Sequence, residues 1–159
     1  MASPSFAISR LQSRPALGIR PRRWQQRLLE LLRRRLQLAA PGVCTDVLIH
    51  AGPGAGKTLG SLYSFLQLRQ GQQLQAICIC CHRSSIANQW KIAAKRLGLD
   101  LGEGVLGSDG LICSYQAANR DPQQWRLLLQ SQAPLQHWLL VADEVHHLGL
   151  DPLQPEEGG

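Results

Sequence analysis

Hydrophobic positions along the chain follow the period of a helix in some segments and gather into short runs in others. Between Trp24 and Leu36 they recur at intervals of three and four, as one face of a helix requires. This helix should end before Pro41 and Gly42, a pair that breaks helices. Its apolar face is expected to consist of Trp24, Leu28, Leu31, Leu32 and Leu36.

The rest of the chain alternates short apolar runs with helical patterns. Residues 46–50, 75–81, 110–115 and 137–142 predict strands, because the runs are short and mostly apolar. One helix is expected after the glycine-rich loop, running to about Gln70, and a second from an N-cap serine near 84 to a stop at Gly98. A third helix is expected after Asp121-Pro122. Strands alternating with helices imply right-handed crossovers and a parallel sheet covered on both faces. The pattern therefore predicts one α/β domain behind a basic helical leader.

Length and charge narrow the class of protein. A chain of 159 residues with 44% hydrophobic residues suits a single domain, and no apolar run reaches the ~20 residues that a membrane-spanning helix needs. The formal net charge is +6, but residues 1–35 hold nine basic side chains and one acid, whereas the remainder holds eight basic and ten acidic ones. This basic stretch either attracts a polyanion such as nucleic acid or is a solvated tail.

The cysteines and the first residues bear on the compartment. Five cysteines are present, an odd number, and reduced, buried thiols in a cytoplasmic protein explain them best. Cys78 and Cys81 form a C-x-x-C pair, but the second pair or spaced histidines of a zinc site are missing. Residues 1–18 lack the apolar core of a secretory signal and read as a disordered leader.

A glycine-rich loop follows the first predicted strand. AGPGAGKT fits the Walker A pattern with Ala51 in place of the first glycine, and small residues let backbone N–H groups surround a phosphate at a helix N-terminus. Lys57 would reach the β- and γ-phosphates, and the Thr58 hydroxyl would bind Mg²⁺. The alternative is a turn that merely links a strand to a helix. The predicted nucleotide-binding residues are Gly52, Pro53, Gly54, Ala55, Gly56, Lys57 and Thr58.

A pair of acids follows the last predicted strand, 86 residues after Lys57. Ligands collect at the carboxyl ends of strands in open α/β sheets, so Asp143 is expected to hold the Mg²⁺ shell and Glu144 to polarise the attacking water. A solvated strand end is the alternative for this pair. The predicted cofactors are ATP and Mg²⁺. His146 and His147 are poor candidates for metal ligands, because adjacent loop positions suit one ion badly.

Taken together, AGPGAGKT and DEVHH resemble motifs I and II of superfamily two DExH-box helicases and translocases. The likeness is to the first RecA-like domain of the group that includes type I and type III restriction helicase subunits. Between the two motifs, Ile86-Ala87-Asn88-Gln89-Trp90 resembles the end of motif Ia, and Cys113-Ser114-Tyr115-Gln116 resembles the segment that follows it. The resemblance covers residues 19–149, with residues 150–159 expected to form a disordered tail.

The resemblance implies further roles for single residues. Gln25 in the Arg20-Pro21 element would bind the adenine edge, with Trp24 or Arg20 beside it, although core packing explains Trp24 equally well. His146 would act with the catalytic Lys57 and Glu144 by coupling nucleotide state to a partner domain. The implied contacts to nucleic acid are Arg83, Ser84, Ser114, Tyr115 and Gln116, with DNA favoured over RNA as the partner. A plain strand end is the alternative for the last three of these residues.

Two departures from the family pattern are visible. His82-Arg83-Ser84 stands where the family has Pro-Thr followed by a basic residue, and the chain stops soon after motif II. We therefore expect a P-loop, RecA-like parallel sheet that is incomplete at the C-terminus, with a second RecA-like domain on a missing segment or supplied in trans.

The expected function is a Mg-dependent ATPase stimulated by nucleic acid, weak or inactive in unwinding by itself. The arginine finger that the second domain contributes in this family is worth ~10³–10⁵ in turnover. The alternatives are an ATP-switched nucleic-acid-binding module without catalysis, another P-loop class such as the AAA+ ATPases, and a fragment that does not fold stably.

Overall fold

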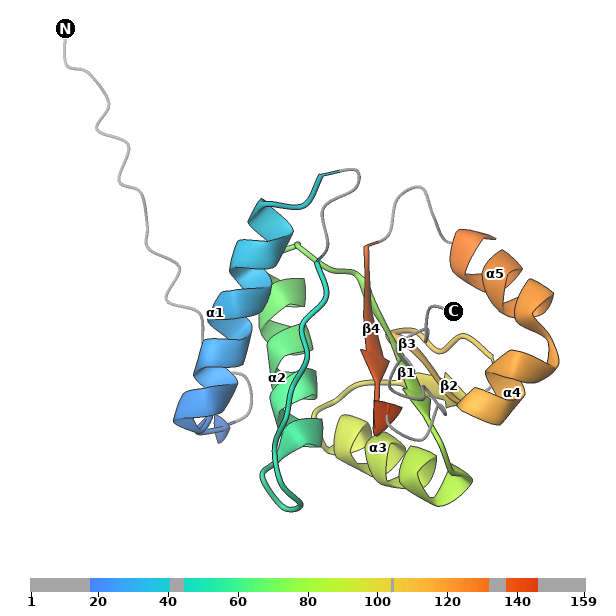
Figure 1. The fold of residues 1–159 in the computed structure, drawn as a ribbon, viewed down its shortest axis with the longest axis horizontal. Coiled ribbons are helices and arrows are strands. Elements are labelled where there is room, and N and C mark those ends of the chain that lie inside the picture. The colour runs from blue at the N-terminus through green and yellow to red at the C-terminus, as the bar shows by residue number, and fades with distance from the viewer. Residues whose placement is uncertain (1–17, 41–44, 104, 132–136, 146–159) are drawn as a thin grey trace, which may run out of the picture.

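The structure is a computed structural model, and it describes residues 18–40, 45–103, 105–131 and 137–145. The elements alternate along most of the chain, as Figure 1 shows. In chain order they are α1 (Arg23–Gln37), α2 (Lys57–Gln70), β1 (Ala76–Cys81), α3 (Ser84–Arg96), β2 (Leu101–Glu103), β3 (Gly110–Ser114), α4 (Tyr115–Arg120), α5 (Pro122–Ser131) and β4 (Trp138–Ala142).

The four strands form one parallel sheet in the order β2-β3-β1-β4. Ile79 at the middle of β1 pairs with Ile112 of β3 on one side and with Val141 of β4 on the other. Because all strands run the same way, their carboxyl ends meet at one edge, which carries the residues that follow β1, β3 and β4. The α/β class with a parallel sheet is therefore confirmed.

Helices cover both faces of the sheet, and each face has its own core. On one face, Ile77, Ile79 and Ile112 pack against α2 and α3, where Phe65 and Trp90 are almost fully buried. On the opposite face the buried side chains are smaller, and α4 and α5 pack over them with Ala118 and Trp125. This second cluster is built on Cys78, Leu111 and Cys113. Burial on both faces explains why β1 and β3 read as near-continuous apolar runs rather than alternating ones, whereas β4 at the edge of the described sheet is only partly buried.

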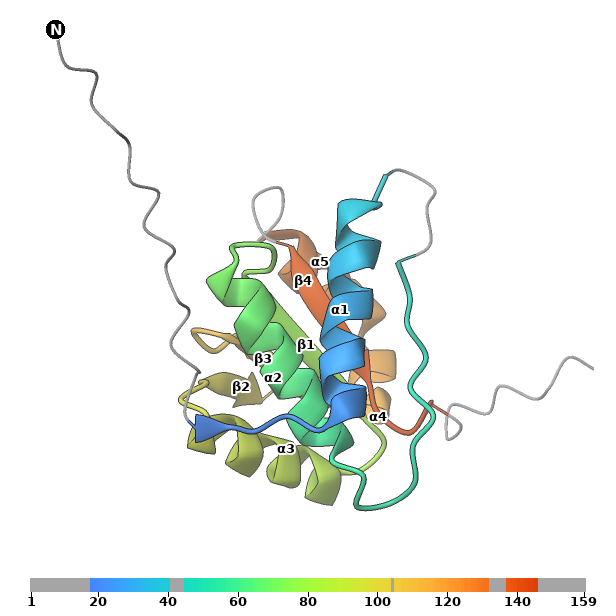
Figure 2. The same ribbon diagram turned by 90° about the vertical axis from the view of Figure 1, so that its left-hand side faces the viewer.

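Helix α1 packs on α2, on the side away from the sheet, and the two run side by side in both views (Figures 1 and 2). Leu28 and Leu29 are buried there, and Leu32 and Leu36 pack against the same core. The predicted face was wrong at Leu31, which is 40% exposed. The buried face of α1 is centred on Gln25. A search for apolar residues misses this position because the side chain is polar.

The strand predicted at residues 46–50 was wrong. The segment is a connection without strand pairing, drawn as a tube with no arrow in Figure 1, and Leu48 is 83% exposed. An apolar run favours extended backbone, but a strand also needs a neighbour to accept its hydrogen bonds. Within the described sheet β1 is the only strand paired with β4, and no strand pairs with 46–50.

Several smaller features differ from the sequence prediction. Strand β2 and helix α4 were not expected, and they are only three and six residues long. The expected N-cap serine of α3 was also wrong: the cap is Arg83, and Ser84 is the first helical residue. The stop at Gly98 is confirmed, because this residue has a φ of +74° and its N–H bonds back to the Lys95 oxygen.

Candidate functional site

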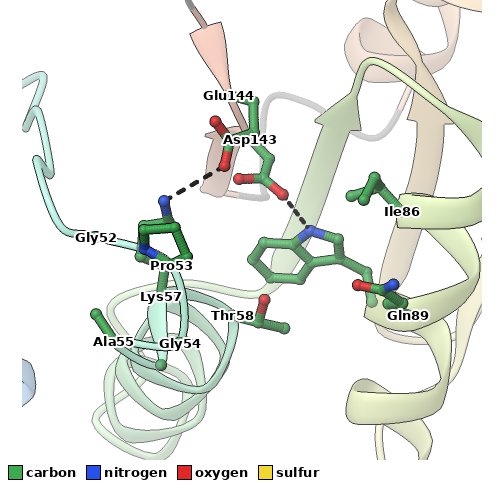
Figure 3. A pocket seen from close by; sticks show the side chains of 12 residues that line it. Gly52, Pro53, Gly54, Ala55, Lys57, Thr58, Ile86, Gln89, Asp143 and Glu144 are labelled. Atoms are coloured by element: carbon green, nitrogen blue, oxygen red, sulfur yellow. Dashed lines mark hydrogen bonds and ion pairs between the residues drawn. The ribbon is translucent and has the colours of Figure 1, made fainter.

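Residues from three parts of the chain line one cavity at the carboxyl edge of the sheet. The cavity has a volume of about 330 Å³, within the range of small-molecule sites. The glycine-rich loop forms one wall, α3 forms another, and the acids after β4 close the third (Figure 3). The lining residues are Gly52, Pro53, Gly54, Ala55, Gly56, Lys57, Thr58, Ile86, Gln89, Trp90, Asp143 and Glu144.

The glycine-rich loop reaches its shape through two left-handed glycines. Gly54 has a φ of +70° and Gly56, the N-cap of α2, has a φ of +86°, values that other residues reach only at a cost. Helix α2 begins immediately afterwards, with Lys57 and Thr58 in its first turn. The first N–H groups of a helix have no partner within it, and the helix dipole is positive there. This wall of the cavity is therefore suited to an anion.

Lys57 spans the cavity from the loop to the acids. Its Nζ donates to the Ala51 carbonyl oxygen at 3.1 Å and to Glu144 Oε1 at 3.3 Å, as the dashed line in Figure 3 marks. The side chains of Lys57 and Glu144 are 30% and 34% exposed. An ion pair this open to water contributes only ~0–1 kcal/mol to stability. A phosphate group is thus able to replace Glu144 as the partner of Lys57 at small cost.

Asp143 is held at three points. Its backbone N–H donates to the Cys80 oxygen at 2.8 Å, and its backbone oxygen accepts from the Tyr115 hydroxyl at 2.9 Å. Its Oδ2 accepts from Trp90 Nε1 at 2.8 Å. Burial raises the pKa of Tyr115 to about 12, so the hydroxyl keeps the proton that it donates. Both the backbone and the carboxylate of Asp143 are therefore fixed before any ligand binds.

The chain turns sharply at Glu144, which has a φ of +54°. A residue with a Cβ pays about 1–2 kcal/mol for this left-handed conformation. The turn sends two neighbouring carboxylates to different partners. Asp143 accepts a hydrogen bond from Trp90, while Glu144 pairs with Lys57, the second contact being visible in Figure 3. The sequence predicts that both acids act, and this turn gives them separate positions in one cavity.

The start of α1 holds the glycine-rich loop from behind. Arg22 Nη1 and Trp24 Nε1 donate to the Ala55 oxygen at 3.0 and 3.2 Å, and Gln25 Nε2 donates to the Gly56 oxygen at 2.9 Å. Gln25 is 1% exposed, and its Oε1 accepts the Arg22 N–H at 2.8 Å. The lining of the cavity does not include Gln25, so its proposed contact with adenine stays a prediction.

The residues predicted to contact nucleic acid follow β1 and β3, so they lie along the same edge as the cavity. Arg83, Ser84 and Gln116 are exposed there. Ser114 instead caps α4, and the Tyr115 hydroxyl is bonded to the site. His146 lies outside the described residues, so the structure gives no position for it.

The donor set of the cavity suits a Mg-nucleotide. Mg²⁺ prefers hard oxygen ligands, which the Thr58 hydroxyl and the Asp143 carboxylate both offer from opposite walls (Figure 3). Phosphate oxygens prefer N–H donors and cations, which the loop, the start of α2 and Lys57 offer. Thr58 and Asp143 thus line one cavity together with the donors suited to phosphate, and their binding of Mg²⁺ stays a prediction.

Three lining residues, Ile86, Gln89 and Trp90, had no assigned role in the sequence prediction. They come from one face of α3, in the segment that resembles motif Ia. A tryptophan on the apolar face of a helix does carry a signal, because its indole N–H needs a hydrogen-bond acceptor once the ring is buried. Sequence spacing gives no means of choosing Asp143 as that acceptor, since the two residues are 53 positions apart.

No cysteine is among the residues that line the cavity. Cys78, Cys80, Cys81 and Cys113 are free, and burial raises the pKa of the Cys81 thiol; Cys44 lies outside the described residues. Across the described ranges, no three His, Cys, Asp or Glu side chains gather as metal ligands. Nor does any helix in those ranges have the length and apolarity to cross a membrane.

Comparison with known proteins points in the same direction as the cavity. A family model described as type III restriction enzyme, res subunit, matches residues 18–154. This span contains the glycine-rich loop, the segment of α3 that lines the cavity, and the acids after β4. The comparison with curated proteins finds no match.

Proposed function

Since the chain belongs to the type III restriction enzyme res subunit family, a helicase-like family of P-loop ATPases, we propose that its cavity binds Mg-ATP and hydrolyses it. The observation that carries this proposal is the meeting of Lys57 with Asp143 and Glu144 in one cavity behind a left-handed glycine loop. The fold class alone would not support it, because one fold serves many functions.

The proposed roles follow from the contacts. Lys57 exchanges Glu144 for the β- and γ-phosphates, and the loop amides donate to the same phosphates. Thr58 and Asp143 hold the Mg²⁺, which when bound neutralises charge on the phosphate oxygens. Glu144, released from Lys57, accepts a hydrogen bond from the attacking water and orients it. The exchange at Lys57 thus links nucleotide binding to the availability of Glu144.

The proposed partner is a nucleic acid strand at the carboxyl edge of the sheet. Arg83, Ser84 and Gln116 are exposed at that edge, where the backbone of a strand would lie beside the cavity. In the resemblance, an arginine from a second RecA-like domain completes catalysis, a contribution worth ~10³–10⁵ in turnover. We expect slow hydrolysis from the 159-residue chain assayed by itself.

Phosphate release with and without single-stranded DNA or RNA tests this proposal. The result in favour is Mg-dependent release that rises with nucleic acid and disappears in the Asp143→Asn variant. Release indistinguishable from that of Asp143→Asn contradicts it. If ATP instead changes the affinity for nucleic acid without being hydrolysed, a nucleotide-switched binding module replaces the ATPase.

A further inference from the structure

Trp90 is a buried residue of α3 that bonds directly to an acid of the candidate site. It is 2% exposed, and its Nε1 lies 2.8 Å from Asp143 Oδ2. That separation is typical of a charge-assisted hydrogen bond to a carboxylate. The indole also lines the cavity itself. Trp90 therefore lines the cavity and contacts Asp143 within it.

The indole is held firmly by its surroundings. Trp90 belongs to the apolar core between α3 and the sheet, together with Ala87 and Ala94 from the same helix. Protein interiors are packed as densely as organic crystals, so a large ring in such a core has little freedom to turn. Its single N–H donor consequently points in one direction, toward Asp143.

The carboxylate has no comparable support from its own backbone. The bonds from Asp143 to Cys80 and from Tyr115 to Asp143 fix the main chain only. Rotation about the side-chain bonds of Asp143 stays open unless the carboxylate itself is held. Of the hydrogen bonds described for that carboxylate, the one from Trp90 supplies the restraint.

We propose that Trp90 is a positioning residue that holds the Asp143 carboxylate in the orientation needed to bind Mg²⁺ with the nucleotide. This inference rests on the proposed function and adds to it. The indole fixes Oδ2 and leaves the rest of the carboxylate directed into the cavity. Groups that orient a metal-binding side chain in this way are commonly worth 10–100-fold in metal affinity.

The test compares Trp90→Phe with Trp125→Phe. Both substitutions keep an aromatic ring and remove an indole N–H, but Trp125 donates to the Ala117 oxygen on the opposite face of the sheet. The measurement is calorimetric titration with ADP over a series of Mg²⁺ concentrations, with thermal unfolding of each variant as a check of folding. Trp90→Phe should raise the apparent Kd for Mg²⁺ by roughly 10–100-fold, with ADP affinity in EDTA within about twofold of the original chain. Trp125→Phe should change neither.

A second measurement covers the case in which Trp90→Phe fails to fold. The measurement is NMR of the ¹⁵N-labelled chain, in which the indole N–H signals are assigned by substituting the tryptophans. The signal of Trp90 is also identified by the change in its chemical shift in the Asp143→Asn variant. Addition of Mg-ADP should move the Trp90 signal, whereas ADP in EDTA should move it far less.

The possible failures are distinguishable. If the original chain binds ADP without any dependence on Mg²⁺, the proposed function falls, and the role of Trp90 falls with it. If ADP binding by the original chain does depend on Mg²⁺, two results overturn the inference about Trp90 alone. One is an unchanged apparent Kd for Mg²⁺ in Trp90→Phe, and the other is a Trp90 indole signal that Mg²⁺ does not move.

Discussion

Lys57 Nζ lies 3.3 Å from Glu144 Oε1, although 87 positions separate the two residues in the chain. One is the residue proposed to bind phosphate and the other is the residue proposed to orient water. While they are paired, neither is available for those roles, and about a third of each side chain is open to solvent. The pair thus marks a resting arrangement that a nucleotide would break.

Replacing Glu144 with Gln should separate binding from hydrolysis. The amide keeps the size of the side chain but loses the negative charge that polarises the attacking water, so ATP turnover should fall by roughly 10²–10⁴-fold. Affinity for Mg-ATP should stay the same or increase, because Lys57 no longer has an anionic partner to leave. Phosphate release and equilibrium nucleotide binding measure the two effects. Glu103→Gln, at an exposed pair with Lys91, is the control. Unchanged turnover in Glu144→Gln would remove this residue from the reaction.

Replacing Gln25 with Ala distinguishes a loop support from an adenine contact. In the structure Gln25 bonds to the Gly56 oxygen, so its loss should loosen the loop and weaken ATP and GTP binding by the same factor, about tenfold. An adenine contact would instead be lost for ATP alone. The measurement is the ratio of the two Kd values. Gln26→Ala, on the exposed side of the same helix, should leave both Kd values unchanged. A selective loss of ATP binding would contradict the support role.

The exposed arginines of α1 offer a test of nucleic-acid binding. Arg23, Arg27 and Arg34 are exposed and lie on one face of the helix by their spacing. If they contact phosphates, exchanging all three for Gln should reduce the slope of log Kd against log salt by about 0.9 per lost contact on B-DNA. Deleting residues 1–35 is a poor test, because it also removes the contacts of Trp24 and Gln25 to the loop.

A second triple variant controls for net charge in that experiment. Arg96, Arg120 and Arg126 are exposed on three other helices, and their exchange for Gln removes the same total charge. Binding that weakens equally in both triples would show that only overall charge matters, and would reject a site on α1.

The end of α2 contains a correctable conformational cost. Gln72 has a φ of +57° and Gly71 a φ of −79°, so the glycine lies one position before the left-handed one. The N–H groups of Gln72 and Gln73 bond to the Arg69 and Leu68 oxygens, the usual pattern at a helix end that favours glycine. Exchanging the order, with Gly71→Ala and Gln72→Gly, should raise the free energy of unfolding by about 1 kcal/mol.

Urea unfolding measures this change, and α3 provides the opposite control. Gly98 occupies the corresponding left-handed position there, so Gly98→Ala should lower the free energy of unfolding by a similar amount. No gain from the exchange at the end of α2 would mean that Gln72 adopts this conformation without cost.

Much of the fold follows from the sequence because the longer elements have clear patterns. Helices α2, α3 and α5 and strands β1, β3 and β4 match the apolar runs and the turn residues that bound them. The short elements β2 and α4 carry too few residues to show a period. The segment 46–50 has the composition of a strand, and its failure to pair depends on the sheet order, which composition does not determine.

The candidate site divides in the same way. The glycine loop and the two acids are local patterns, and the parallel sheet explains why they meet. The contacts of Gln25 with the loop and of Trp90 with Asp143 join residues 31 and 53 positions apart, so they depend on how helices pack. The burial of Leu31 was wrongly predicted for a related reason. A polar residue, Gln25, occupies the centre of the buried face of α1, so the apolar pattern alone places that face incorrectly.

Calorimetric titration of the 159-residue chain with Mg-ATP measures whether the cavity is a nucleotide site, with Lys57→Ala as the matched variant. The Lys57 ammonium reaches into the cavity from the start of α2, and removing it takes away a charged donor worth about 1.5–3 kcal/mol, or roughly 10–100-fold in Kd. We predict saturable binding by the original chain. Binding should be lost or weakened by at least that factor in Lys57→Ala, with thermal unfolding showing that both proteins are folded. No binding by the folded chain, or equal binding by both, would contradict it.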